Sequence, residues 1–217
     1  YGMPNTLPVT LKMMIAHGEA VNRFCSRALC VIDMPFGSYQ ASPAQAFDNA
    51  ARVLRDTGAQ AIKLEGGTEM AETIRFLVER GVPVLGHVGL RPQQVNVTGG
   101  YRVAGKTDAA QEKLFADARA VEEAGAFGVV VEGTIEEAAR ALTASINIPT
   151  IGIGASSACD GQILVTEDVL GLTPGPKAKF VKPYASFYGE AEKALANLAA
   201  DVKARRFPGP QQIYEKK

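Results

Sequence analysis

Short apolar runs alternate with amphipathic helical patterns along this chain of 217 residues. Runs that are rich in Val and Ile and bounded by Gly, Pro or charge are typical of buried strands in a parallel sheet. Six strands are predicted, at Ala28–Asp33, Ala61–Glu65, Val82–His87, Phe127–Glu132, Pro149–Gly154 and Lys179–Pro183. Helices are predicted at Leu11–Phe24, Pro43–Thr57, Thr68–Arg80, Ala109–Ala124, Ile135–Ser145 and Glu190–Arg206.

An internal repeat supports a strand–helix array. The segment Thr57–Gly66 resembles Ala124–Gly133 at an offset of 67 residues, and Gly81–Gly86 resembles Asn147–Gly152 at an offset of 66. Each offset spans two strand–helix units. A doubly wound sheet would give the same alternation. The (β/α)₈ barrel is favoured because acidic residues recur at the ends of several strands, where barrel active sites are built.

Six strands are too few for such a barrel. A six-stranded parallel arc leaves two unpaired edges, which a closed barrel does not have. We therefore expect about two N-terminal strand–helix units to be missing from the sequence. Residues 1–217 are interpreted as a single barrel domain, incomplete at its N-terminal side, with a C-terminal helix and tail over residues 190–217.

Composition narrows the class of protein. With 47% hydrophobic residues the chain can bury a substantial core, and its 23 basic and 23 acidic residues give no electrostatic reason to bind nucleic acid or anionic membranes. No apolar run is long enough to cross a bilayer, and no signal peptide is visible. The 3 cysteines have no CxxC spacing, which argues against structural zinc or a disulfide framework. A cytoplasmic protein is expected.

Charged residues at strand ends are the candidates for chemistry. Lys63 and Glu65 are two positions apart, so they point to the same face of their strand, and two glycines follow. An internal salt bridge is the alternative interpretation. Asp33 and Glu132 each close an apolar run, and either could simply cap the next loop. Because acidic residues close three separate strands, we interpret them as one functional set and not as a chance arrangement.

Such a set of carboxylates favours a particular kind of catalysis. Carboxylates without His or Cys neighbours in the sequence favour a hard cation such as Mg²⁺. A 2-oxo acid can chelate that cation, which withdraws electrons from the carbonyl and stabilises an enolate. A carboxylate kept off the metal can remove the proton, and a nearby lysine can balance the carboxylate of the substrate.

Three further features are weaker signals. His87 lies at another strand end. A structural role for its imidazole is slightly favoured over an accessory role in the site. The segment Asn96–Tyr101 is interpreted as a flexible loop that could cover the substrate. Ala194, Leu198 and Val202 form an apolar face on the last helix, which packing or subunit contact would explain.

An ordered series of motifs resembles the ketopantoate hydroxymethyltransferase family over nearly the whole chain. Individually some of these motifs are weak, but their order is highly specific. They are Thr6–Thr10, Asp33–Phe36, Lys63–Gly67, Gly86–Leu90, Val95–Asn96 with Gly99–Tyr101, Ile151–Ala155, Asp160–Gln162 and Phe207–Gly209.

The resemblance implies a (β/α)₈ barrel of the phosphoenolpyruvate/pyruvate superfamily. Members transfer a hydroxymethyl group from 5,10-methylenetetrahydrofolate to 3-methyl-2-oxobutanoate, a step in pantothenate and coenzyme A synthesis. By resemblance, Asp33 and Glu65 would bind Mg²⁺, Asp33 and Lys63 would contact the oxo acid, and Glu132 would accept the proton. The family forms decamers of two stacked pentameric rings.

The chain departs from the family pattern in three places. The Gly-Asp-Ser segment, which supplies another metal ligand and a substrate contact in the family, would lie before Tyr1. Glu132 is followed by Gly133–Ile135 instead of Cys-Val-Pro, and Pro210–Tyr214 replaces a histidine-containing ending. Two alternative functions are a C–C lyase or mutase of the same superfamily and a catalytically inactive scaffold subunit.

Overall fold

The structure is a computed structural model that describes residues 1–215. It divides into two compact units, residues 1–163 and residues from 164 onward, which are described separately. The end of the tail predicted over 190–217, residues 216 and 217, lies outside the described residues.

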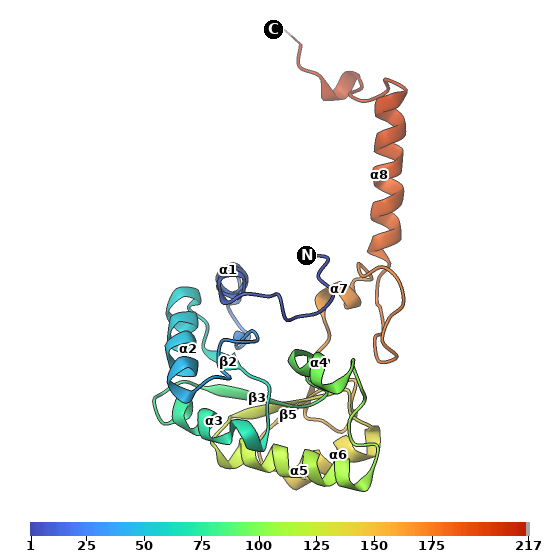
Figure 1. Ribbon diagram of the computed structural model, residues 1–217. Helices are drawn as coiled ribbons and strands as arrows, with labels where there is room; N and C mark the ends of the chain where they lie inside the picture. The colour runs from blue at the N-terminus through green and yellow to red at the C-terminus, as the bar shows by residue number, and fades with distance from the viewer. Residues whose placement is uncertain (216–217) are drawn as a thin grey trace. The chain divides into compact units, whose positions relative to one another are not determined.

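A six-stranded parallel sheet forms the centre of the first unit, and its strands lie in chain order. The strands are β1 (Val31–Asp33), β2 (Ala61–Lys63), β3 (Val84–Gly89), β4 (Gly128–Glu132), β5 (Thr150–Ile153) and β6 (Gly161–Gln162). The sheet is curled (Figure 1). A parallel α/β fold is thus confirmed, whereas a closed eight-stranded barrel is not formed within the described residues.

Five of the predicted strands are confirmed, four at shorter lengths and β3 shifted by two residues, but the sixth is wrong. Residues Lys179–Pro183 belong to the second unit and are irregular, with Val181 donating a local backbone hydrogen bond to Ala178. The sixth strand is β6, which pairs with Ile151 and Gly152 of β5. A strand of two residues shows no alternation in the sequence, because a period of two needs a longer run to appear.

The first unit also contains five of the six predicted helices, with the predicted Thr68–Arg80 divided into η1 and α3; the sixth lies in the second unit. Its helical elements are α1 (Leu11–Asn22), α2 (Pro43–Thr57), η1 (Thr68–Met70), α3 (Ala71–Val78), η2 (Pro92–Gln94), α4 (Val95–Thr98), α5 (Asp108–Glu123) and α6 (Glu136–Ser145). Helices α1, α2, α3 and α5 contact the sheet, and α5 also contacts α6 (Figure 1). The expected loop Asn96–Tyr101 is wrong in its first half, because residues 96–98 lie in α4.

Helix α2 shows why local sequence sets the bounds of an element. The hydroxyl of Ser42 accepts a hydrogen bond from the backbone N–H of Gln45, and Pro43 occupies the first helical turn. Gly58 ends the helix in the left-handed conformation, with φ of 70°. The predicted bounds of this helix are therefore confirmed at both ends.

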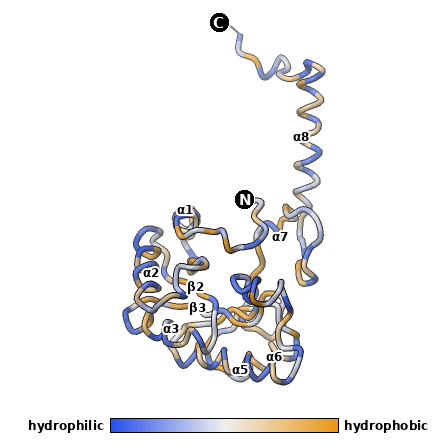
Figure 2. The backbone as a smooth tube through the Cα atoms, in the orientation of Figure 1, coloured by the Kyte–Doolittle hydropathy of each residue, from blue (hydrophilic) through white to orange (hydrophobic). Residues whose placement is uncertain are grey.

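Strand alternation separates the face of the sheet that packs in the core from the face that carries the charged residues. Ile62 and Leu64 are completely buried in the hydrophobic core, which also contains Leu77, Val121 and Leu142 from the helices. Side chains on a strand alternate between faces, so Lys63 and Glu65 point away from this core. Figure 2 shows hydrophobic residues along strands β2 and β3 and many hydrophilic residues on α2.

The second unit contains α7 (Thr166–Val169), α8 (Phe187–Lys203) and η3 (Pro210–Gln212). Helix α8 has no buried residue, and its apolar side chains Leu195, Leu198 and Val202 are exposed. Within the described residues, no helix combines the length and the hydropathy needed to span a membrane.

Candidate active site

The charged residues predicted from strand ends meet at the carboxyl ends of neighbouring strands. Asp33 ends β1 and pairs with Lys63 of β2, and Glu132 ends β4, where it pairs with Gly89 of β3. His87 lies on β3 between them. Parallel register therefore brings together side chains that are up to 99 positions apart in the sequence (Asp33 and Glu132).

A continuous set of contacts links these side chains. Lys63 Nζ lies 2.9 Å from Asp33 Oδ1 and 3.1 Å from His87 Nδ1. The other ring nitrogen of His87, Nε2, lies 3.1 Å from Glu132 Oε2. Nδ1, the nitrogen that faces Lys63, also lies 3.8 Å from Glu65 Oε1. The contacts at Asp33 Oδ1 and His87 Nε2 are close but lack hydrogen-bond alignment.

The contacts of His87 define its tautomer. A lysine ammonium can only donate hydrogen bonds, so Nδ1 of His87 accepts from Lys63 and the ring proton lies on Nε2, toward Glu132. Burial and the charge of Lys63 hold the pKa of His87 well below its usual value, so the imidazole is neutral. The side chain of His87 is only 2% exposed. The ring is therefore a fixed connection between a cation and a carboxylate.

Two of the carboxyl groups have pKa values near neutrality. Burial raises the pKa of Glu132 to about 7, against the opposing effect of the charge on Lys63. Burial likewise raises the pKa of Glu65 to about 7, and Lys63 again opposes the shift. A carboxyl group with a pKa near the working pH can accept a proton and return it, as a general base requires.

Loop residues that the sequence patterns did not indicate hold Glu65 in place. The backbone N–H of Gln93 donates to Glu65 Oε2 at 3.0 Å, and the backbone N–H of Glu65 donates to the Tyr39 hydroxyl at 3.1 Å. The Tyr39 hydroxyl in turn donates to Gln93 Oε1 at 2.8 Å. Tyr39 lies in the loop after β1 and Gln93 lies in the short η2, and neither segment has a periodic pattern, so only the fold shows their role.

The donor set fits a hard divalent cation. The Oδ1 atom of Asp33 is buried and has no aligned hydrogen-bond partner, and Glu65 is a buried carboxylate near Lys63. Mg²⁺ is commonly bound by one or two carboxylates together with water and substrate oxygens. Among the described residues, no group of three or more His, Cys, Asp or Glu side chains is arranged to hold a metal. A cation here would therefore depend on Asp33 and Glu65 together with oxygens from other sources.

A cation, a neutral imidazole and carboxyl groups with near-neutral pKa values, all at the carboxyl ends of parallel strands, define an α/β enzyme. Comparison with known proteins gives the particular family. The family model for ketopantoate hydroxymethyltransferase matches residues 1–210, and the chain belongs to that family.

Similar proteins are named 3-methyl-2-oxobutanoate hydroxymethyltransferase. The one from Rhodospirillum rubrum is 58% identical over 99% of this chain and 77% of its own length. The one from Rhodospirillum centenum is 60% identical over 99% of this chain and 78% of its own length. The one from Rhizobium rhizogenes is 56% identical over the whole chain and 80% of its own length.

Solved structures resemble the fold at much lower identity. A putative phosphonomutase from Burkholderia cenocepacia has a TM-score of 0.54 at 21% identity, over 89% of this chain and 79% of its own. A 2,3-dimethylmalate lyase of the PEP mutase/isocitrate lyase superfamily has a TM-score of 0.53 at 17% identity, over 94% of this chain and 68% of its own. These likenesses concern the fold alone.

Proposed function

We propose that the chain carries hydroxymethyl transfer from 5,10-methylenetetrahydrofolate to 3-methyl-2-oxobutanoate, giving 2-dehydropantoate. The observation that carries this proposal is the placement of Lys63 and Glu132 on opposite nitrogens of His87, at 3.1 Å each. An anionic oxo acid needs a cation to hold it and a base to remove its C3 proton, and this arrangement supplies both.

Lys63 and Asp33 are proposed to bind the oxo acid, with the Lys63 ammonium facing the carboxylate of the substrate. Glu132 takes the proton from C3, and the electron pair of the broken C–H bond is delocalised into the enolate. Water hydrolyses the N–CH₂–N bridge of the folate, which breaks both C–N bonds. The two protons of water go to the two nitrogens of tetrahydrofolate, and its oxygen stays on the one-carbon unit at the oxidation level of formaldehyde. C3 of the enolate then forms a C–C bond with that carbon, the proton held by Glu132 returns to the resulting alkoxide to give the hydroxymethyl group, and tetrahydrofolate is released.

Asp33 and Glu65 are the proposed ligands of Mg²⁺. When bound, the cation would withdraw electron density from the carbonyl of the oxo acid and so stabilise the enolate. Tyr39 and Gln93 hold Glu65 through the hydrogen bonds described above, so that its carboxylate keeps one orientation.

His87 is proposed as a positioning residue. Its Nε2–H faces the carboxylate of Glu132 and its Nδ1 accepts from Lys63, so the ring fixes the base relative to the cation. Catalytic hydrogen bonds are often imperfectly aligned before substrate binds. A small rotation of the Glu132 carboxylate would complete this one.

The remaining family properties are proposed for this chain as well: a strand–helix array of the (β/α)₈ barrel type, a homodecamer and a cytoplasmic location. The exposed apolar residues Leu195, Leu198 and Val202 of α8 support a subunit contact, because large side chains of this kind are usually covered in the assembled protein.

Deuterium exchange at C3 of the oxo acid, followed by NMR without folate, tests the proposal. Glu132→Gln should abolish exchange and leave binding of the oxo acid in place, while the exposed Glu123→Gln should exchange like wild type. Unchanged exchange in Glu132→Gln would refute the role of this base. Turnover of another oxo acid without folate would favour a lyase, and no metal-dependent binding of oxo acid by calorimetry would favour a scaffold.

A further inference from the structure

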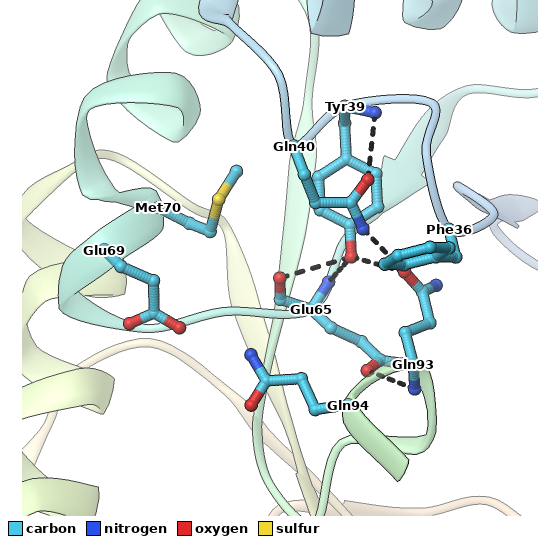
Figure 3. A pocket seen from close by; sticks show the side chains of 8 residues that line it. All are labelled: Phe36, Tyr39, Gln40, Glu65, Glu69, Met70, Gln93 and Gln94. Carbon is cyan, nitrogen blue, oxygen red and sulfur yellow. Dashed lines mark hydrogen bonds between the residues drawn. The ribbon is translucent and has the colours of Figure 1, made fainter. Parts of the chain in front are cut away.

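A cavity borders the site and is lined in part by Glu65. Its volume is about 300 Å³, at the lower end of the range for small-molecule sites. Figure 3 shows its lining, which is Phe36, Tyr39, Gln40, Glu65, Glu69, Met70, Gln93 and Gln94. The loops after β1, β2 and β3 supply these residues, so the cavity opens at the carboxyl ends of the strands.

Part of the wall is rigid. Gln40 Nε2 donates to Gln93 Oε1 at 3.0 Å, and Gln40 Oε1 accepts from the backbone N–H of Gly37 at 2.8 Å. Gln93 Nε2 donates to the carbonyl of Met34 at 2.8 Å. The two side-chain amides hydrogen-bond to each other and to backbone groups, so they shape the cavity and are not available to a ligand.

The remaining lining residues are available to a ligand. Phe36 is 51% exposed and presents its ring at the cavity (Figure 3). The side-chain amide of Gln94 makes no hydrogen bond among the described residues. The carboxylate of Glu69 is held by Arg91, and its other oxygen lies 4.0 Å from Lys113 Nζ. The cavity thus combines a flat apolar surface with a free amide and a fixed carboxylate.

We propose that this cavity binds the pterin ring of the folate donor, with the ring stacked on Phe36 and its polar edge at Gln94 and Glu69. The inference rests on the proposed function, which requires a folate. A pterin is a flat bicyclic ring whose edge carries both donors and acceptors of hydrogen bonds. An aromatic face, an amide and a carboxylate match that chemistry.

The position of the cavity suits transfer of the one-carbon unit. Glu65 forms a wall of this cavity and also lies 3.8 Å from the ring of His87, so the two sites share one side chain. A larger cavity of about 410 Å³ is lined by Asp33, Lys63 and apolar residues. It offers no amide to a pterin edge, and its two polar residues are assigned to the oxo acid.

Binding of tetrahydrofolate, measured by calorimetry on the purified full-length protein, tests the assignment. Phe36→Ala should weaken binding about tenfold because it removes the stacking surface. Gln94→Leu should weaken it several-fold, because it removes the amide while keeping the volume. The same variants should raise the KM for 5,10-methylenetetrahydrofolate by similar factors.

Matched controls separate a local effect from a general one. Phe24→Ala removes an exposed ring elsewhere, and Gln211→Ala removes an exposed amide, so both should bind tetrahydrofolate like wild type. Wild-type affinity for tetrahydrofolate in both Phe36→Ala and Gln94→Leu would overturn the proposal. An equal loss of tetrahydrofolate affinity in Phe36→Ala and Phe24→Ala would also overturn the proposal.

Exchange at C3 without folate distinguishes this inference from the proposed function. If wild-type protein exchanges deuterium and the cavity variants bind tetrahydrofolate normally, only the pterin assignment fails. If wild-type protein does not exchange at all, the proposed function itself fails. If the cavity variants bind tetrahydrofolate more weakly but exchange deuterium within about twofold of the wild-type rate, both the pterin assignment and the proposed function are supported.

Discussion

The Nε2 atom of His87 lies 3.1 Å from Oε2 of Glu132, on a ring whose other nitrogen accepts from Lys63. The proposed base therefore faces a neutral N–H group whose tautomer is fixed by a cation. This relationship resembles the way in which a catalytic base is commonly held by a third group. Replacing the imidazole should therefore change the rate and the pH profile of C3 exchange.

Replacing His87 tests this positioning role. His87→Leu should lower the rate of C3 exchange about 100-fold and move the rising limb of the pH profile upward, because the carboxylate of Glu132 loses a donor. His87→Gln should recover much of the rate, since its amide can donate in place of Nε2–H. Equal losses in both variants with an unshifted pH profile would indicate packing alone. Thermal unfolding of each variant shows whether the fold is retained.

The raised pKa of Glu132 predicts the pH dependence of exchange. A base must be deprotonated, so the rate should fall about tenfold per pH unit below the pKa of about 7 and level off above it. Rates measured from pH 5 to about 9 check this. A profile that is flat from pH 5 to about 8 would contradict the assignment.

The same pKa has a consequence for stability. The folded-state pKa of Glu132, about 7, exceeds the ordinary value of 4.5, so between these pH values the folded state binds more protons than the unfolded state. Stability should therefore fall as pH rises through this window, by an amount of the order of 2–3 kcal/mol from this residue. Glu132→Gln should be the more stable protein at pH 8 in urea unfolding without metal, and the difference should vanish near pH 4.

Removal of metal tests Asp33 and Glu65. Chelation with EDTA should stop exchange, and added Mg²⁺ should restore it. In titration calorimetry, Asp33→Asn and Glu65→Gln should each weaken Mg²⁺ binding by more than about tenfold. Asp48→Asn, at an exposed acidic residue on α2, is the matched control and should bind Mg²⁺ like wild type. Equal affinities in all four proteins would contradict the proposed ligands.

Gly67 tests the packing behind the site. A Cβ atom at Gly67 would lie 2.1 Å from Cγ of Asp117, whose Oδ1 accepts from the backbone N–H of Thr68 at 2.9 Å. Gly67→Ala should therefore destabilise the protein by about 1–3 kcal/mol in urea unfolding. Gly189→Ala, in α8, meets only one distant atom and should be neutral or slightly stabilising. Equal stability of the two variants would contradict the steric argument.

Periodicity and capping in the sequence predicted most of the elements. Alternating apolar runs located five of the six strands, and Ser42, Pro43 and Gly58 defined α2 because caps act within one helical turn. Asp33, Lys63, Glu65 and Glu132 were indicated as candidates because charge at the end of an apolar strand is unusual.

The sequence by itself thus determined a parallel strand–helix array, and its motifs indicated the family. Tertiary structure alone decided that β6 pairs at Gly161, that His87 connects Lys63 to Glu132, and that Tyr39 and Gln93 hold Glu65. The physical reason is the distance along the chain over which each effect acts. Propensity and capping act over a few neighbouring residues, whereas these contacts depend on the register between strands and on loops that meet only when the sheet is complete.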